Sequence, residues 1–472
     1  MSNDFVFKKI IQSKEIFMRK FGVRDQVGYL FGDMAGSFVN LYVDAFFLTF
    51  CTYVLGVSPY FMASLFLGAR LWDAVNDPII GSFPDRWQIG KSGDKFKPYI
   101  KIAMIPLALS VVLAFYDVSS LPTTAKHIWI VFAYIFYGMS YTGTSMPYGS
   151  LVAVITDDPV ERTKLSRARS FGGLIVGAGF LSIVPQVIFN KDGDVVPVNF
   201  FYIAVVFAVF SLLSYLVTLK LTTERIRQPK LENEKFDYGK VLKSVLKNRP
   251  LIGVMVATVG SLLYITANSQ LGAYIYKEYY NAPQVLTFVT LSMIPVMLIA
   301  FPIIPKLAGK YGKRKLILGF TFFNLICALF LLLVPIESVY VFMVLYTVAN
   351  SGQTVFAMII WALVTDTLDY HEYITGERSD GSLFSIYTFS RKLGSTLAST
   401  LASVMLGLVG FVSGAATQVP AVAENIRTMT TAVPVIATIL QLIGIGVIFN
   451  LSKDRMDEIQ AELKGKRMLK AN

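Results

Sequence analysis

The sequence is poor in charge and in cysteine. Asp, Glu, Lys and Arg make up 16% of its 472 residues, whereas about a quarter of the residues of a soluble domain are charged. The two cysteines, Cys51 and Cys327, both stand inside long apolar runs, so a disulfide framework is excluded and both are expected to be small packing residues. The net charge of +12 comes without a soluble basic domain, and this excludes nucleic acid as a partner.

Long apolar runs are what the sequence has instead. Hydrophobic residues make up 54% of the chain and its mean hydropathy is +0.57, values typical of a protein embedded in a lipid bilayer. Runs of about 20 residues, the length that crosses a bilayer as a helix, recur along the whole sequence. We therefore expect an all-α polytopic membrane protein with twelve transmembrane helices, at residues 27–55, 59–84, 99–117, 127–155, 167–189, 198–220, 250–276, 284–308, 314–334, 338–366, 381–412 and 429–451.

The placement of Lys and Arg predicts the orientation of the chain. Cytoplasmic loops carry the excess of these residues, and the segment 220–249 alone has nine of them, against four in the six odd-numbered loops together. Both termini are therefore expected in the cytoplasm, with the chain crossing the inner (plasma) membrane many times. The first 24 residues are polar and basic and have no apolar core, so we expect no cleavable signal peptide.

The long polar segment in the middle of the chain divides the expected spans six and six. The predicted organisation is a cytosolic N-terminal segment (1–24), an N-terminal six-helix bundle (25–220), a cytosolic linker (221–249), a C-terminal six-helix bundle (250–452) and a cytosolic tail (453–472). The second half repeats the first in the spacing of its spans and in a basic loop after its second span, a pattern typical of internal repeats in transporters.

Three charged residues interrupt the second span. Arg70, Asp73 and Asp77 fall on one face of a helix, and the two carboxylates are four residues apart, a spacing at which like charges repel. Each unneutralised charge inside a bilayer costs about 2.5–3.5 kcal/mol even on a lenient scale, so such a face indicates a function. Arg70 can offset one carboxylate, which leaves the other to bind a proton or a metal cation.

Polar residues in the first and fourth spans are expected to face a cavity. The first span has a polar stripe at helical spacing, formed by Asp33, Ser37, Asn40 and Asp44. In the fourth span, Pro147 and two glycines interrupt the apolar run at 141–150, as in the broken helices of transporter binding sites. The alternatives are hydrogen bonds that join neighbouring helices and a kink that serves packing.

The eleventh span carries two adjacent cations. Arg391 and Lys392 point about 100° apart on a helix, so one can face a cavity while the other pairs elsewhere. Lys392 lies four residues after Thr388 on the same face, and it is expected to be the one in the cavity. The alternative is that both cations extend to the inner interface.

Several motifs in the same order give the chain a resemblance that covers nearly its whole length. The chain resembles the glycoside/pentoside/hexuronide cation symporter family, the melibiose permease group of the major facilitator fold. The segments that carry the resemblance are Arg70-Leu-Trp-Asp-Ala-Val-Asn-Asp-Pro-Ile-Ile-Gly81, Lys95-Phe-Lys-Pro98, Tyr141-Thr142, Pro147-Tyr-Gly-Ser-Leu151, Asp366-Thr-Leu-Asp-Tyr370 and Arg391-Lys392-Leu-Gly394. The resemblance implies two six-helix bundles that work by alternating access.

The resemblance also implies a cation site. The family holds its coupling cation with two carboxylates and an Asn of the second helix and a Thr of the fourth, which match Asp73, Asp77, Asn76 and Thr142. Four oxygen-bearing side chains suit a hard cation such as Na⁺, although protons can use the same carboxylates. Arg70 and Arg391 are interpreted as charge partners, and no cofactor is expected besides Na⁺ or H⁺ as the coupling ion.

The substrate site that the resemblance implies differs in part from the site of melibiose permease. In melibiose permease one Asp on the first helix and one on the fourth hold galactoside hydroxyls, and these positions match Ser37 and Ser145 here. The expected substrate-binding residues are Asp33, Ser37, Asn40, Tyr141, Ser145, Arg169, Thr388 and Lys392. The loss of both carboxylates disfavours melibiose. Without the two carboxylates, Arg169 and Lys392 have less negative charge near them, so they could bind a carboxylate of the substrate. A hexuronide and a neutral glycoside or pentoside therefore both remain candidate substrates.

These observations predict a sugar/cation symporter rather than an enzyme. Its partners are expected to be a small sugar and the lipid bilayer, with the protein as a monomer. A rival of the same fold would carry a lysolipid or another amphiphile, and a further rival would be a sugar sensor that does not transport. An intramembrane aspartyl hydrolase fits less well, because its two carboxylates should come from different helices to share one water and one proton.

Overall fold

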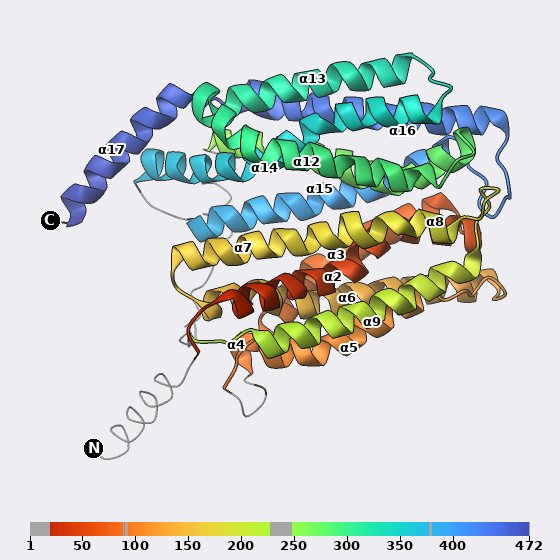
Figure 1. Cartoon of the computed structure of the whole chain (residues 1–472), viewed down its shortest axis with the longest axis horizontal. Helices are drawn as coiled ribbons and strands as arrows, with labels where there is room; N and C mark the ends of the chain where they lie inside the picture. Colours follow the sequence, from red (N-terminus) through yellow and green to blue (C-terminus); the bar gives the residue numbers. More distant parts are fainter. Residues whose placement is uncertain (1–18, 88, 90–92, 227–247, 377–379, 472) are drawn as a thin grey trace. The chain divides into compact units, whose positions relative to one another are not determined.

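The structure, a computed structural model, describes residues 19–87, 89, 93–226, 248–376 and 380–471. Helices dominate this described part of the chain (Figure 1), which contains no strand beyond an isolated bridge between Phe189 and Val195. The all-α expectation is therefore confirmed. Most of the expected N-terminal segment (1–24) and of the expected linker (221–249) lies outside the described residues.

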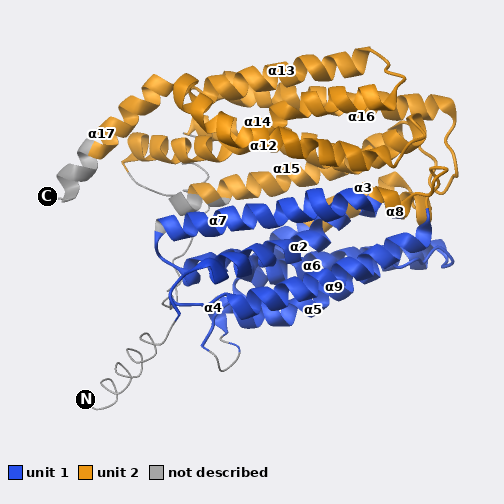
Figure 2. Cartoon of the chain, in the orientation of Figure 1, with its two compact units in different colours: residues 1–50, 71–184, 196–234 blue, residues 51–70, 185–195, 235–472 orange. Residues whose placement is uncertain are grey.

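The chain forms two compact units, which are coloured separately in Figure 2. Unit 1 comprises residues 1–50, 71–184 and 196–234, and unit 2 comprises residues 51–70, 185–195 and 235–472. Two segments that the sequence places in the N-terminal half, 51–70 and 185–195, thus belong by their contacts to unit 2. The first long helix therefore begins in unit 1 and ends in unit 2.

Unit 1 is built from the helices of the N-terminal half. Its elements are α2 (Val23–Thr49), the part of α3 (Pro59–Gly81) that follows Arg70, α4 (Phe83–Arg86), α5 (Lys97–Ala114), α6 (Thr123–Ile155), α7 (Pro159–Leu174), η2 (Ile175–Phe180), η3 (Leu181–Ile183) and α9 (Pro197–Leu221). Helix α2 continues into η1 (Phe50–Val54), and η3 continues into α8 (Val184–Ile188). Both continuations lie almost wholly in unit 2.

Unit 2 holds the helices of the C-terminal half. They are α11 (Arg249–Tyr274), which continues as η4 (Ile275–Tyr279), α12 (Val285–Tyr311), α13 (Lys313–Leu333), α14 (Val339–Thr375), α15 (Asp380–Leu408), α16 (Pro420–Leu442), which continues as η5 (Ile443–Ile448), and α17 (Lys453–Ala471). The first part of α3, up to Arg70, also packs here.

The long helices of the two units pair in the same order. In unit 1, α2 contacts α7 and α9, and α5 contacts α6 and α9. In unit 2, α11 contacts α15 and α16, and α13 contacts α14 and α16. These helices hold the first, third, fourth, fifth and sixth places of their halves, so the two units share one plan. The repeat expected from the spacing of the spans is thus present in the helix pairing.

Each of the twelve expected spans coincides with a helix in the described part of the chain. Nine of the described helices are long and apolar enough to cross a membrane. The other three expected spans are α3, α6 and α15. Charged residues interrupt α3 and α15, and α6 is rich in Tyr, Ser and Thr. The least apolar spans are therefore the ones on which the sequence predicts most of the binding residues.

Helix α5 begins at a carboxylate from another part of unit 1. Glu224, which follows α9, accepts hydrogen bonds from the backbone N–H groups of Lys95, Phe96 and Lys97 at 2.6, 2.9 and 2.8 Å. Burial raises the pKa of Glu224, whereas these three N–H donors lower it. The first N–H groups of a helix have no partner within the helix, so Glu224 satisfies them and fixes the start of α5 to the end of α9.

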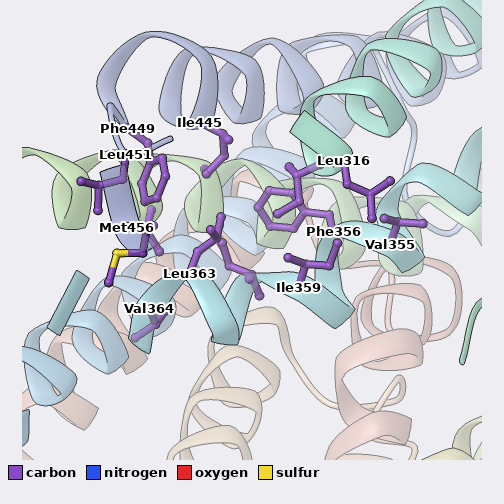
Figure 3. Packing of buried hydrophobic residues seen from close by; sticks show 14 of the residues in the cluster. Leu316, Val355, Phe356, Ile359, Leu363, Val364, Ile445, Phe449, Leu451 and Met456 are labelled. Carbon is purple, nitrogen blue, oxygen red and sulfur yellow. The ribbon is translucent and has the colours of Figure 1, made fainter. Parts of the chain in front are cut away.

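The core of unit 2 is centred on α14. Phe356, Ile359 and Leu363 of α14 pack with residues of α13, η5 and α17 (Figure 3). Helix α17 contributes Met456 and Ile459, whose side chains are buried in this cluster. The tail that the sequence predicts as a cytosolic segment of mixed charge is thus an amphipathic helix with one face packed into unit 2.

Helix α11 and η5 approach each other at backbone contact. A Cβ added at Gly253 would lie 2.6 Å from the carbonyl oxygen of Gly444, and one added at Gly444 would lie 2.5 Å from the carbonyl oxygen of Gly253. Only glycine fits at such a distance, because any side chain would overlap the facing backbone.

We expect Gly253→Leu to destabilise the protein by forcing α11 and η5 apart. Overpacking of this kind costs at least about 1–3 kcal/mol, so the midpoint of thermal unfolding in detergent should fall by at least about 3 °C. The matched control is Gly319→Leu on α13, where an added Cβ meets nothing within 4 Å and the midpoint should stay unchanged. Equal midpoints for the two variants would contradict the close approach.

Candidate functional site

Helices α3 and α6 of unit 1 bring the two carboxylates of the second span against the fourth. The hydroxyl of Thr142 donates a hydrogen bond to Asp77 Oδ1 at 2.7 Å. One turn earlier on both helices, a Cβ added at Gly138 would lie 3.3 Å from Asp73 Oδ1. Because both pairs advance in the same direction along the chain, the two helices run parallel here with these faces opposed.

The polar groups at this contact are largely withdrawn from solvent. Asn76, Asp77 and Thr142 are 5, 8 and 7% exposed, and Asp73 is half-buried. The amide nitrogen of Asn76 is buried without a hydrogen-bond partner. Carboxylate, amide and hydroxyl oxygens are the ligands that hard cations prefer. Of the four residues expected to hold the cation, the structure brings Asp77 and Thr142 into contact and places Asp73 one turn away against the same helix, whereas the position of the Asn76 side chain in such a site stays a prediction.

Arg70 stands one turn before Asp73 on α3, but its own contacts assign it to unit 2. The change of unit occurs between Arg70 and Leu71, within one continuous helix. Its interpretation as the charge partner of the carboxylates stays a prediction.

Helices α2 and α7 form a second polar contact in unit 1. Arg169 Nε donates to Asp33 Oδ1 at 3.0 Å, and the side chains of this ion pair are 53 and 17% exposed. A Cβ added at Gly173 would lie 3.1 Å from Asp33 Oδ2 and 3.7 Å from the hydroxyl oxygen of Ser37. The glycine on α7 therefore leaves room for both polar side chains of α2.

An aromatic pair supports the arginine of this contact. The guanidinium of Arg169 lies 5.5 Å from the centre of the Tyr148 ring, and that ring stacks on Tyr29 at 4.6 Å. The Tyr148 hydroxyl donates to the carbonyl oxygen of Tyr29 at 2.7 Å. Arg169 is thus offset by Asp33 and held over an aromatic face, which differs from the sequence expectation of a less neutralised cation.

The rest of the α2 stripe faces tyrosines of α6. Asn40 donates to Asp44 at 2.9 Å and accepts from the Tyr137 hydroxyl at 3.0 Å. Tyr141 lies on the same side of α6, since a Cβ added at Gly36 of α2 would be 3.7 Å from its ring. Ser145, one turn further along α6, is half-buried.

The predicted residues of α15 lie in unit 2. Thr388 donates to the carbonyl oxygen of Phe384 within its own helix at 2.9 Å. The guanidinium of Arg391 lies 5.1 Å from the centre of the Trp361 ring, whereas the Lys392 side chain is exposed. That Thr388 and Lys392 share one cavity with the residues of unit 1 stays a prediction.

Several residues of these contacts were not predicted as site residues from the sequence, among them Tyr29, Tyr137, Tyr148, Gly138 and Gly173. Tyr148 stands inside the Pro147-Tyr-Gly-Ser motif, so a signal was present, but the motif does not say that its ring would face Arg169. The two glycines carry no signal of their own, because their importance lies in the side chain that approaches them.

Comparison with known proteins gives a consistent result. Residues 28–453 match the family model described as MFS/sugar transport protein. The chain is 29% identical to the uncharacterized symporter YjmB of Bacillus subtilis (strain 168), over 95% of this chain and 96% of that protein. It is 27% identical to the glucuronide carrier protein homolog of Escherichia coli (strain K12), over 94 and 96% of the two chains.

Solved structures of transporters resemble the fold of this chain. A bacterial homologue of the human lysosomal transporter Spinster, in an inward-facing state, aligns with a TM-score of 0.62 at 12% identity, over 91% of this chain and 98% of that one. A D-xylose-proton symporter aligns with a TM-score of 0.58 at 14% identity, over 89 and 95% of the two chains. At such low identities the likeness concerns the fold alone.

Proposed function

The chain belongs to the MFS/sugar transport family, and on this premise we propose that it is a symporter that couples the entry of Na⁺ or H⁺ to the uptake of a sugar. Membership of a family of major facilitator transporters makes the protein a multi-pass membrane transporter rather than an enzyme. The intramembrane aspartyl hydrolase is thereby removed as a rival.

The observation that carries the proposal is the contact between Asp77 and Thr142. The Asp77 side chain is buried, at 8% exposed, and it accepts a hydrogen bond from the Thr142 hydroxyl. A carboxylate oxygen and a hydroxyl oxygen from two helices thus lie together, and both are ligands that a hard cation such as Na⁺ prefers, while a proton could bind the same carboxylate. Asp73, one turn away on the same face, supplies the second carboxylate of the expected site.

Helix α6 gives a physical route for coupling. Its residues Gly138 and Thr142 contact α3, while Tyr137 and Tyr148 contact α2. A cation that draws α3 and α6 together would also position Tyr137 against Asn40 and Tyr148 against Arg169. Sugar affinity should then rise when the cation is bound, and by reciprocity the cation should bind more tightly in the presence of sugar.

The ion pair of Asp33 and Arg169 supports a sugar as the substrate. Neighbouring hydroxyls can donate to the carboxylate and accept from the guanidinium at once, so a sugar can bridge the pair without leaving either charge unpaired. A substrate carboxylate would instead have to displace Asp33 from Arg169. Relatives named as symporters and a glucuronide carrier homolog agree with a carrier of sugar-like substrates.

We expect Thr142→Val to weaken Na⁺ binding without unfolding the protein. The substitution keeps the size of the side chain and removes a hydroxyl oxygen that is both an expected ligand and a partner of Asp77. Loss of such a partner typically lowers metal affinity about 10- to 100-fold, so the Na⁺ concentration for half-maximal uptake should rise by roughly this factor. Sugar uptake into vesicles, with Na⁺ and pH gradients imposed separately, measures this and identifies the coupling ion.

Two further variants test whether the hydroxyl and the carboxylate are each required. Thr142→Ser keeps the hydroxyl and should transport like the parent, and Asp77→Asn should abolish accumulation against a gradient. The matched control is Thr438→Val, a buried threonine of α16 whose hydroxyl donates to carbonyl oxygens of its own helix. Unchanged cation dependence in both Thr142→Val and Asp77→Asn would refute the assignment of this site.

We expect Asp33→Asn to weaken sugar binding by about tenfold or more, because the charged acceptor for the sugar hydroxyls is lost. Binding of labelled sugars to purified protein measures the effect, with a neutral glycoside, a hexuronide and a lysolipid compared in parallel. Asp117→Asn, in an exposed loop, is the control. Tighter hexuronide binding in Asp33→Asn would mean that Arg169 binds a substrate carboxylate instead, and lysolipid binding alone would favour the amphiphile carrier.

A further inference from the structure

Unit 2 contains a buried ion pair to which the cation and sugar sites give no role. Lys277 and Glu278, neighbours in η4, are joined by a hydrogen bond of 2.8 Å, and their side chains are only 7 and 4% exposed. By the orientation that the basic loops predict, this end of α11 faces the outside of the cell.

Groups from two other segments of unit 2 form hydrogen bonds with both members of the ion pair. The Tyr53 hydroxyl of η1 donates to Glu278 Oε1 at 2.8 Å, and the Lys277 ammonium lies 4.9 Å from the centre of the Tyr53 ring. The loop between α15 and α16 contributes the Ala416 carbonyl oxygen, which accepts from Lys277 at 3.1 Å, and the Gln418 N–H, which donates to Glu278 Oε2 at 3.3 Å. Both charges are therefore satisfied only while all three segments are in place.

Further contacts tie η1 to the same two segments. The hydroxyl groups of Thr52 and Tyr274 are 2.7 Å apart, and the Gly414 N–H donates to the Thr52 carbonyl oxygen at 2.9 Å. The Tyr53 ring stacks on Tyr274 and meets Phe411 edge to face, each at 5.3 Å. The end of the first helix is thus fastened inside unit 2, although the rest of that helix belongs to unit 1.

We propose that Tyr53, Lys277 and Glu278, with the loop 411–418, form an outer latch that must open whenever the transporter admits substrate from outside. The proposal rests on the transport function proposed above. Alternating access moves the two halves of such a fold against each other. A helix that begins in one unit and is fastened in the other resists that movement until its end is released.

The chemistry of the latch suits a contact that opens repeatedly. A permanently closed contact gains little from a buried ion pair, because apolar residues of similar size are often as stabilising or more so. When the latch opens, however, water can hydrate Lys277 and Glu278, whereas an apolar seam would expose its whole surface at a cost. Closed and open states are therefore close enough in free energy to interconvert.

The experiment measures how fast a cysteine placed in the latch reacts with a reagent added outside, because the thiol becomes accessible when the latch opens. Ser413 lies in the loop beside Gly414, and its hydroxyl is buried, so Ser413→Cys in full-length protein with Cys51→Ala and Cys327→Ala gives one buried thiol. Right-side-out vesicles are treated with a membrane-impermeant maleimide-polyethylene glycol, and the gel shift is followed over time. This readout needs no substrate.

Tyr53→Phe removes the hydrogen bond and keeps the ring, so it should raise the labelling rate by about 3- to 10-fold. Glu278→Gln also removes the charge that balances Lys277, and it should raise the rate further. The matched control is Tyr280→Phe, which loses a single hydroxyl contact to the Ile336 carbonyl oxygen near the same end of α11 and should label like the parent.

Labelling at the parent rate in both Tyr53→Phe and Glu278→Gln overturns the latch, whatever the transport result. Faster labelling in Tyr280→Phe as well would also overturn it, because the effect would then be a general loosening. Failure of the parent to transport any sugar would count against the proposed function and leave the labelling comparison intact, so the two failures are distinguishable.

Discussion

The cost of placing charge in an apolar helix bundle is the constraint on which this structure depends. In the described part of the chain, buried carboxylates meet a donor or a cation from a different element: Asp77 meets Thr142, Asp33 meets Arg169 and Glu278 meets Tyr53. Each of these contacts therefore also joins two helices. A change in the charge at any of them, such as the binding of a cation, alters the packing of the helices that supply the partners.

This constraint explains why the candidate functional residues gather on a few elements. Helix α6 contacts α3 through Thr142 and α2 through Tyr137 and Tyr148, so one helix adjoins both the carboxylates of the second span and the ion pair of Asp33 and Arg169. Two of the elements that the outer latch joins, η1 and η4, are π-helical turns at the ends of α2 and α11. Such turns are frequent where a helix has a functional role.

Much of the fold could be predicted from the sequence, because a bilayer restricts a chain to few solutions. Apolar runs of sufficient length predicted a helix for each of the twelve expected spans, although not the polar helix α17, and the expected family is confirmed by the match over residues 28–453. The sequence also identified Asp73 and Asp77 as candidates, since they are four apart in a span that is otherwise largely apolar, while Asn76 and Thr142 came from the family resemblance; their role as a cation site stays a prediction. The pairing of Arg169 with Asp33 was not, because the two residues are 136 positions apart and nothing in either segment identifies the other.

The sequence by itself determined which charged residues are candidates for a function, because a charge in a transmembrane helix is costly and indicates one. Only the tertiary structure decided what each of them contacts. It brought Thr142 to Asp77 and neutralised Arg169 with Asp33. It also assigned the end of the first helix to unit 2, where Tyr53 meets Glu278. Helical periodicity fixes the face on which a side chain lies, whereas the neighbour that covers that face depends on how helices from distant parts of the chain pack.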